Sequence, residues 1–240
     1  MNYKNYKFGC IIYSRMKSSR FPQKAKFKLE GISLLERVIK RTKKINNQKV
    51  IILATSIDKS DDYICEIAKK NNIAFHRGSL ENVYERTIEI LKKFNLDYFA
   101  RICGDRPLLD PFVHDLAFKQ CLTEKLDLCS SLYPKILPAG LTVEVISAKS
   151  FLSIDKNKIS DFNKEHITNE YYESPSSYKI KSLSLPLDIK WPNVENFSYT
   201  LDERKDIDFL NYNIRNLVNV KFVIKYHLRL QEIASDWNKI

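Results

Sequence analysis

The sequence predicts an α/β fold with a mostly parallel sheet flanked by helices. Short, continuous apolar runs alternate with segments of helical periodicity through the first 110 residues or so. Such runs are typical of strands that are buried on both faces, and the alternation requires parallel strands joined by helical crossovers. No repeat, low-complexity tract or clear linker interrupts the chain, so we expect one domain over residues 1–240.

The first half alternates strands and helices in order. The expected strands are Phe8–Tyr13, Val50–Ala54, Ile73–Phe75 and Asp97–Cys103. Ser33 and Glu36 form a capping-box pattern, which predicts a helix whose apolar face is Leu34, Leu35, Val38, Ile39 and Ile45. Further helices are expected over Asp61–Asn71 and Leu80–Phe94, the second capped by Ser79.

The second half is less regular, and five prolines punctuate its loops. We expect strands at Leu141–Ser147 and Lys179–Leu185, and helices at Lys164–Tyr172 and Asp206–Leu217. Ligands of open parallel sheets bind beyond the carboxyl ends of the strands. The segments Ser14–Lys28, Thr55–Asp58 and Gly104–Asp105 follow three of the expected strands and therefore mark a candidate site.

Composition excludes several classes of protein. Apolar residues make up 44 %, which is ample for a core, but no apolar run approaches the roughly 20 residues that cross a bilayer. The basic start lacks the long apolar segment of a secretory signal. The five cysteines form no C-x-x-C pair, so reduced thiols in a cytoplasmic protein fit best.

The net charge of +11 has several readings. It is compatible with binding of nucleic acid, an anionic membrane or small anionic substrates. The chain is also rich in Lys, Asn and Ile, a bias that genome composition alone can produce. Charge by itself therefore leaves the partner open.

A basic loop follows the first strand. Its six cations are Arg15, Lys17, Arg20, Lys24, Lys26 and Lys28, and it contains no acid. Cations gathered at the carboxyl end of a strand suit a triphosphate, whose charge must be neutralised as pyrophosphate leaves. The Walker A pattern is absent, and a solvated basic loop remains the alternative.

The sequence resembles the CMP-sugar synthetases, and most closely the spore-coat polysaccharide F-type cytidylyltransferases. The opening I-I-Y-S-R-M-K-S-S-R-F-P-Q-K carries the resemblance, with L-L-E-R-V-I-K-R downstream. It continues in six blocks that occur in the family's order, at 54–58, 75–86, 101–111, 138–145, 165–168 and 199–202. Each block alone is a weak signal, but six in sequence between about Phe8 and Leu210 are specific.

The resemblance implies a glycosyltransferase-A-like fold and the reaction of CTP with an acidic sugar to CMP-sugar and pyrophosphate. It implies a nucleotide-binding half at about 7–112 and an acceptor-binding half at about 113–240, with Glu144 and His166 expected at the acceptor. The residues expected at the nucleotide are Arg15, Ser19, Arg20, Lys24, Thr55, Asp58, Gly78, Ser79, Arg86 and Gly104. Of these, Arg15 and Lys24 are expected to act in catalysis together with Asp105.

Asp105 and Asp202 match the two metal-binding positions of the family. Mg²⁺ prefers oxygen ligands and usually takes one or two carboxylates together with phosphate oxygens and water. Asp105 lies in the turn Gly104–Pro107, and Asp202 follows an apolar run. We therefore expect Mg²⁺ as the cofactor, although a turn-forming Asp and a helix cap would explain the same two residues.

The chain also departs from the family pattern. Gln23 replaces the usual Gly after Pro22, and Thr142 stands where relatives often have Asp. The segment typical of enzymes that activate 3-deoxy-manno-octulosonate (KDO) is absent after Ser79. These departures leave the acidic sugar open, whether KDO-like or nonulosonic-acid-like.

Three alternatives remain at the level of sequence. The first is a nucleotidyltransferase that uses another triphosphate, and the second a metal-dependent sugar transferase, for which Asp206-Ile-Asp208 would be the D-x-D signature. The third is a basic nucleic-acid-binding module. For the preferred reading we expect CTP and an anionic sugar as partners, no stable nucleic-acid complex, no membrane insertion and a possible homodimer.

Overall fold

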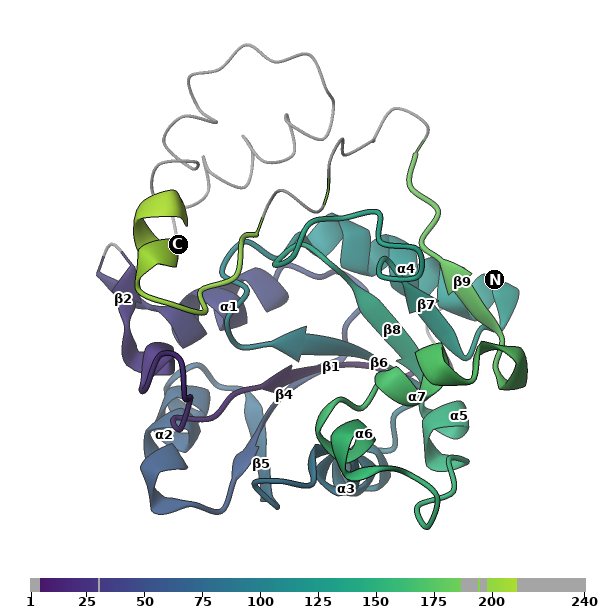
Figure 1. Cartoon of the computed structure of the whole chain (residues 1–240), viewed down its shortest axis with the longest axis horizontal. Coiled ribbons are helices and arrows are strands. Elements are labelled where there is room, and N and C mark those ends of the chain that lie inside the picture. The colour runs from purple at the N-terminus through teal and green to yellow at the C-terminus, as the bar shows by residue number, and fades with distance from the viewer. Residues whose placement is uncertain (1–4, 30, 187–193, 195–197, 211–240) are drawn as a thin grey trace.

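The computed structural model of the chain describes residues 5–29, 31–186, 194 and 198–210. A seven-stranded sheet of order β5-β4-β1-β6-β8-β7-β9 runs through it (Figure 1). Four neighbouring strands are parallel, namely β1 (Phe8–Tyr13), β4 (Val50–Ser56), β5 (Ala74–Gly78) and β6 (Tyr98–Cys103). These are the four strands that the apolar runs of the first half predict.

The second half of the chain extends the same sheet. Strand β8 (Glu144–Ser147) pairs antiparallel with both β6 and β7 (Leu128–Ser130), and β9 (Ile180–Ser182) pairs parallel with β7. The mostly parallel α/β sheet is thus confirmed. The two strands expected in this half are present but shorter, and β7 was not predicted because its three residues are too few to show a pattern.

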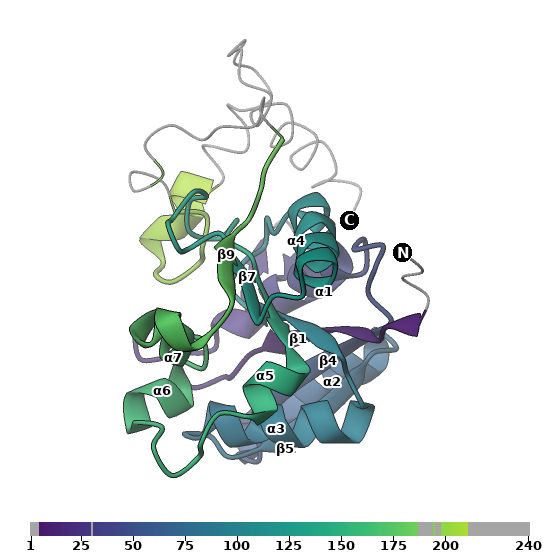
Figure 2. The ribbon, with the colours of Figure 1, turned by 90° about the vertical axis from the view of Figure 1, so that its right-hand side faces the viewer.

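Helices cover both faces of the sheet and enclose two cores (Figures 1 and 2). The larger core packs α1 (Leu34–Thr42), α2 (Asp62–Lys70) and α4 (Pro111–Glu124) against one face. The other core packs α3 (Val83–Phe94), α5 (Ala148–Leu152) and Tyr171 of α7 (Asn169–Glu173) against the opposite face, and α6 (Asp161–Glu165) lies beside α3. Among the residues described, no helix combines the length and apolar character needed to cross a bilayer.

The helix starts test the capping predictions. The capping box is confirmed, since the Ser33 hydroxyl accepts from the Glu36 amide and also contacts the Glu36 carboxylate. The cap predicted at Ser79 is wrong: α3 begins three residues later than expected, and the side chain of Asn82 accepts from the Glu85 amide. Ser79 instead accepts from the amide of Asn82, so it fixes the turn before the helix.

The helix expected over 164–172 is interrupted. Helix α6 ends at Glu165 and α7 begins at Asn169, and His166 between them has φ −101° and ψ 68°, outside the helical region. The helix expected over 206–217 is described only as far as Leu210, and begins at Lys205.

The loop after β1 begins at the carboxyl ends of the parallel strands. It contains the 3₁₀ turn η2 (Lys24–Lys26) and leads into the short hairpin of β2 (Lys28–Leu29) and β3 (Ile32–Ser33). Gln23, which replaces the family's usual Gly, has φ 60° and therefore adopts the left-handed conformation that glycine tolerates best. The chain keeps the turn although the residue is not glycine.

Segment 198–202, although distant in sequence, lies near the same strand ends. The amide of Tyr199 donates to the Ala139 carbonyl at 2.8 Å, and the amide of Leu201 donates to the Asp105 carbonyl at 3.0 Å. Gly140, with φ +87°, makes this approach possible, because a Cβ there would lie 2.4 Å from the Tyr199 carbonyl carbon. Residue 202 is thereby brought beside the turn after β6.

We predict that Gly140→Ala lowers the free energy of unfolding by at least about 2 kcal/mol more than Gly31→Ala, because added backbone strain and a backbone clash both lie in that range. Gly31 is a matched control, since it has φ +85° but nothing within 4 Å of an added Cβ. Urea unfolding of both variants measures the difference. Equal losses would show that the close approach at Gly140 contributes nothing.

Candidate active site

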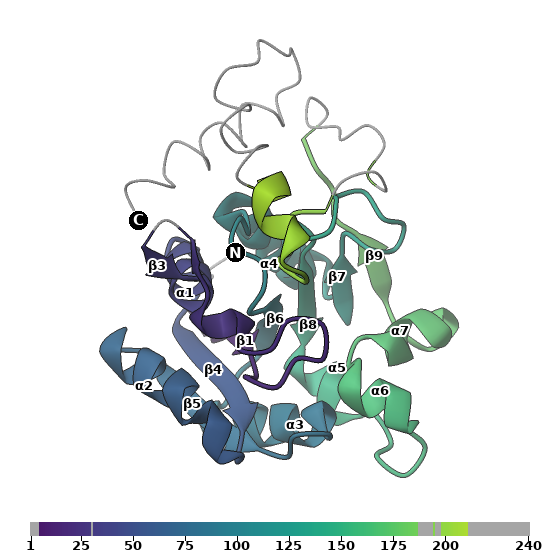
Figure 3. The same cartoon turned by 60° about the vertical axis from the view of Figure 1, so that its left-hand side comes forward.

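A cleft of about 300 Å³ opens at the carboxyl ends of β1 and β6. The loop after β1 lines one side, and α3 and the α6–α7 junction line another. Figure 3 shows the ribbons of β1, α3 and α6 in this part of the molecule. Polar and charged side chains dominate its lining. Those from the expected site residues are Arg15, Ser19, Arg20, Lys24, Arg86, Asp105 and His166, and Gly104 also contributes. Most residues predicted for the nucleotide, metal and acceptor therefore come together.

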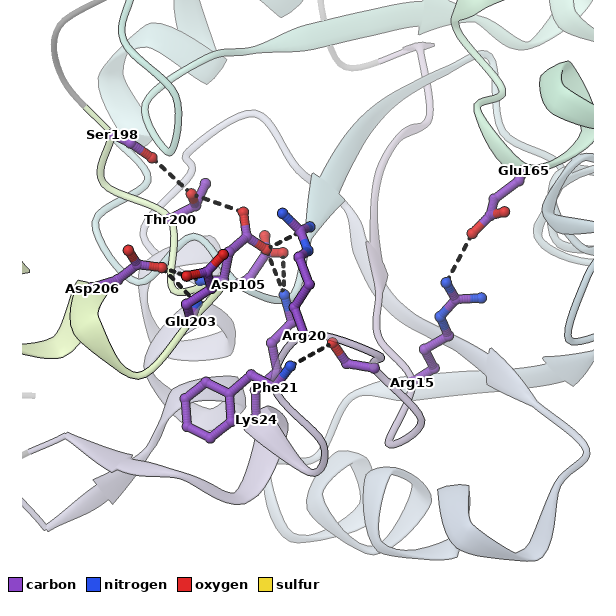
Figure 4. Close-up of polar contacts among 12 residues, drawn as sticks. Arg15, Arg20, Phe21, Lys24, Asp105, Glu165, Ser198, Thr200, Glu203 and Asp206 are labelled. Carbon is purple, nitrogen blue, oxygen red and sulfur yellow. Dashed lines mark hydrogen bonds and ion pairs between the residues drawn. The ribbon is translucent and has the colours of Figure 1, made fainter.

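Lys24 joins the two predicted metal ligands. Its ammonium nitrogen lies 2.7 Å from Asp105 Oδ2 and 3.1 Å from Asp202 Oδ1, although the two carboxylates are 97 positions apart in the sequence (Figure 4). The two oxygens are therefore no further apart than the sum of these distances. Burial lowers the pKa of Lys24, but the two carboxylates outweigh it and hold that pKa above its usual value. The side chain is therefore a charged ammonium.

Arg20 and Thr200 complete the environment of Asp202. Arg20 Nη2 donates to Asp202 Oδ1 at 3.1 Å, and the Thr200 hydroxyl donates to Asp202 Oδ2 at 3.3 Å. The Asp206 carboxylate accepts from the backbone amides of Asp202 and Glu203 at 2.8 and 2.6 Å. Asp206 thus fixes the backbone that carries Asp202, a role that the sequence alone did not suggest.

The donors present suit a hard cation. The two carboxylates contact one ammonium, so their oxygens converge on one point, as the ligands of a single ion do. No cluster of three or more His, Cys, Asp or Glu forms in the part of the chain that the structure describes. An ion held by two carboxylates keeps its other positions for phosphate oxygens and water, which is the pattern that Mg²⁺ prefers.

A buried carboxylate anchors the basic loop. Asp61 is 1 % exposed and accepts from the Met16 amide at 2.8 Å, from the Ser56 amide and from the hydroxyls of Thr55 and Ser56. It thereby ties the loop after β1 to the end of β4. Asp61 was not predicted for the site, and its sequence signal is only that a carboxylate follows a buried strand closely.

Thr55 and Asp58 lie outside the cleft. The Thr55 side chain is buried and donates to Asp61, while Asp58 pairs with Lys17 and caps the turn η3 (Lys59–Asp61). Asp58, Gly78 and Ser79 line a second hollow of about 600 Å³. Arg86 connects the two hollows, because it lines the cleft and donates from Nη1 to the Ser79 carbonyl.

Arg86 is a buried arginine that lines the cleft. It is only 4 % exposed, and its Nε is buried without a hydrogen-bond partner among the described residues. Burial lowers the pKa of Arg86. A buried guanidinium N–H that lacks an acceptor is costly, so an anion in the cleft would relieve this cost.

The two residues predicted for the acceptor have different environments. His166 is exposed in the cleft at the break between α6 and α7, where its ring packs against Phe162. The Glu144 side chain is 0 % exposed and pairs with Arg101. Arg101 was missed, although an arginine inside the apolar run Y-F-A-R-I-C is a signal that some partner must accept its charge.

A second ion pair spans the cleft. Arg15 Nη2 lies 2.8 Å from Glu165 Oε1, and both side chains are 46 % exposed (Figure 4). This pair links the loop of the first half to α6 of the second half. A pair this exposed contributes little to stability, so a ligand can displace it at low cost.

Two curated relatives match most of the chain. An uncharacterised protein of Methanocaldococcus jannaschii is 29 % identical over 87 % of this chain and 88 % of its own length. The spore coat polysaccharide biosynthesis protein SpsF of Bacillus subtilis is 26 % identical over 82 % of each.

Solved structures show the same fold. A cytidylyltransferase from Leptospira borgpetersenii superposes with a TM-score of 0.80 at 23 % identity, covering 98 % of this chain and 96 % of its own. A CMP:2-keto-3-deoxy-manno-octonic acid synthetase complexed with CTP has a TM-score of 0.66 at 11 % identity, covering 88 % and 99 %. At these identities the likeness establishes the architecture alone.

The family model named cytidylyltransferase matches residues 9–228, which includes every element that contributes to the cleft. The resemblance in the six sequence blocks is thereby confirmed. The chain belongs to the cytidylyltransferase family and is a CTP-dependent nucleotidyltransferase.

Proposed function

We propose that this protein activates an acidic sugar with CTP, giving a CMP-sugar and pyrophosphate for the synthesis of a surface polysaccharide or glycan. The observation that carries the proposal is the convergence of Asp105 and Asp202 on Lys24 within a cleft lined by arginines. Two similarities support it. The Bacillus subtilis relative bears the name of a spore coat polysaccharide biosynthesis protein, and one structural neighbour is a CMP-sugar-acid synthetase.

The cleft suits an in-line displacement at phosphorus. A sugar hydroxyl would form a bond to the α-phosphorus of CTP while the bond from that phosphorus to the bridging oxygen breaks, and pyrophosphate takes the electron pair. Arg20 and Lys24 contact the two carboxylates, and Arg15 lies on the same loop; these three cations would neutralise the triphosphate. Arg86 would bind phosphate from the α3 side. The hydroxyl proton passes to solvent or to a phosphate oxygen.

We further propose Mg²⁺ as the cofactor, held by Asp105 and Asp202. The pair of carboxylates supports this assignment because both already contact one cationic nitrogen. When bound, the ion would supply positive charge to the phosphate oxygens. Lys24, Arg20 and Thr200 would then orient the two carboxylates and the phosphates around it.

The sugar-transferase alternative has weaker support. In its D-x-D signature, Asp206 uses one carboxylate oxygen to accept two backbone amides, and Asp208 is exposed and does not line the cleft. A metal-binding D-x-D would present both carboxylates to one cavity. The segment instead serves to place Asp202.

We predict that CTP stabilises the protein more than UTP, ATP or GTP does when Mg²⁺ is present. A ligand at 100 times its dissociation constant adds about 2.7 kcal/mol of stability, so a thermal-shift series distinguishes the four nucleotides. Cys103 gives a second readout, since it lines the cleft and is partly accessible whereas the other four cysteines are buried. CTP should slow its alkylation. A larger shift with another triphosphate would contradict the assignment of the base.

We predict that Asp105→Asn and Asp202→Asn each abolish Mg²⁺-dependent release of pyrophosphate while the protein stays folded. Both side chains are partly exposed, at 20 and 27 %, so their replacement leaves no buried charge alone. Asp208→Asn is the matched control and should keep full activity. Binding of Mn²⁺ together with CTP, followed by electron paramagnetic resonance, should weaken in the two site variants only. Unchanged Mn²⁺ binding in both would exclude the shared site.

A further inference from the structure

Arg101 is a charged residue within a buried strand. It lies on β6 between Ala100 and Ile102, which are 0 and 1 % exposed, yet its own side chain is 19 % exposed and lines the cleft. It pairs in register with Ile11 of β1, so it belongs to the floor of the cleft. An arginine in such a place requires both a partner for its charge and a reason to reach solvent.

Glu144 is the partner, and both of its carboxylate oxygens accept hydrogen bonds from other side chains. Its Oε2 accepts from Arg101 Nη1 at 2.8 Å, its Oε1 accepts from the Tyr172 hydroxyl at 2.8 Å, and that hydroxyl lies 2.7 Å from Ser130 Oγ. Burial raises the pKa of Glu144, but the charges of Arg101 and Arg106 and these hydrogen bonds hold it below its usual value. Glu144 is therefore an ionised carboxylate that holds Arg101 and does not face a ligand.

Most of the donors of Arg101 remain free for a ligand. A guanidinium has five N–H groups, and within the described part of the chain Glu144 is the one acceptor that Arg101 contacts. The fixed carboxylate holds the plane of the guanidinium before any ligand arrives. Anion binding would therefore cost little side-chain entropy, in contrast to binding by a mobile surface arginine.

Arg101 is held by residues from the half of the chain that is expected to bind the acceptor. Lys24 and Arg20 contact the pair Asp105 and Asp202, and Arg15 contacts the exposed Glu165. Of the carboxylates that hold these cations, Glu144 on β8 alone is completely buried, and it contacts Tyr172 on α7, whose hydroxyl contacts Ser130 on β7. His166, from the same half, lines the same cleft.

We infer that Arg101 binds the carboxylate of the acceptor sugar, and that Glu144 and Tyr172 are positioning residues that hold it. The inference rests on the proposed function and adds to it the residue that selects an acidic acceptor. Because Glu144 balances its charge, Arg101 would recognise an anion through directed N–H donors. The planar fork of a guanidinium also matches a carboxylate.

The test compares an acidic acceptor with its neutral carboxamide in wild-type protein, Arg101→Gln and Arg101→Lys. Eight- and nine-carbon 2-keto-3-deoxy sugar acids are the acceptors, and pyrophosphate release is the assay. Arg101→Gln should raise the KM for the acid about 10- to 100-fold, as expected for the loss of a charge-assisted hydrogen-bonded pair. It should change the KM for the carboxamide and for CTP less than about threefold.

The positioning residues and a control complete the design. Tyr172→Phe removes one hydrogen bond to Glu144 and should raise the acceptor KM by a smaller factor, again for the acid only. Lys181→Gln is the control, because Lys181 lies on β9 of the same sheet and pairs with Glu124 outside the cleft. It should behave as wild type with both acceptors.

Three outcomes would overturn the inference. If Arg101→Gln and Arg101→Lys impair the acid and the carboxamide equally, or raise the KM for CTP as much, Arg101 only supports the sheet. If Arg101→Gln does not fold, Arg101→Lys keeps the charge and decides the question by the same comparison. If wild-type protein uses a sugar phosphate or a neutral sugar but none of the acids, the acidic acceptor itself is wrong, a failure that is distinct because CTP is still consumed.

Discussion

The site depends on the close approach of segment 198–202 to the turn after β6. Two backbone hydrogen bonds, from Tyr199 to Ala139 and from Leu201 to Asp105, fix this approach, and only a residue without a Cβ fits at Gly140. Backbone contacts of this kind tolerate little displacement, since the carbonyl and the amide must meet at about 3 Å. Together with the Asp206 carboxylate, which accepts from the amides of Asp202 and Glu203, they place Asp202 beside Asp105.

The two halves of the sheet contribute different parts of the cleft around this point. The parallel strands of the first half bring the basic loop to the cleft, and buried Asp61 holds that loop against β4. The antiparallel strand β8 of the second half lies next to β6 in the sheet, and its Glu144 pairs with Arg101. The first half thus supplies the arginines and the lysine of the cleft, and each half supplies a buried carboxylate that holds a part of the cleft in place.

The sequence predicts the first half well because its signals are local. Continuous apolar runs give β1, β4 and β6, and Ser33 with Glu36 gives the start of α1. The second half depends on pairings distant in sequence, so the short strand β7, the interruption at His166 and the burial of Glu144 have no comparable local signal. Family motifs identified most cleft residues, but a motif does not say whether a carboxylate faces a ligand or another side chain. Glu144 shows that difference.

Lys24 has a consequence for the kind of anion that the cleft accepts. Its ammonium contacts both Asp105 and Asp202, so a polyanion that draws Lys24 away would leave Asp105 without its cation, and Asp202 with Arg20 alone, beside the added negative charge. A polyanion that brings a divalent cation restores the balance, and a bare one does not. The cleft would therefore select ligands by their total charge as well as by their shape. Although the protein is strongly basic, phosphate polyanions without a divalent cation would bind weakly at this site.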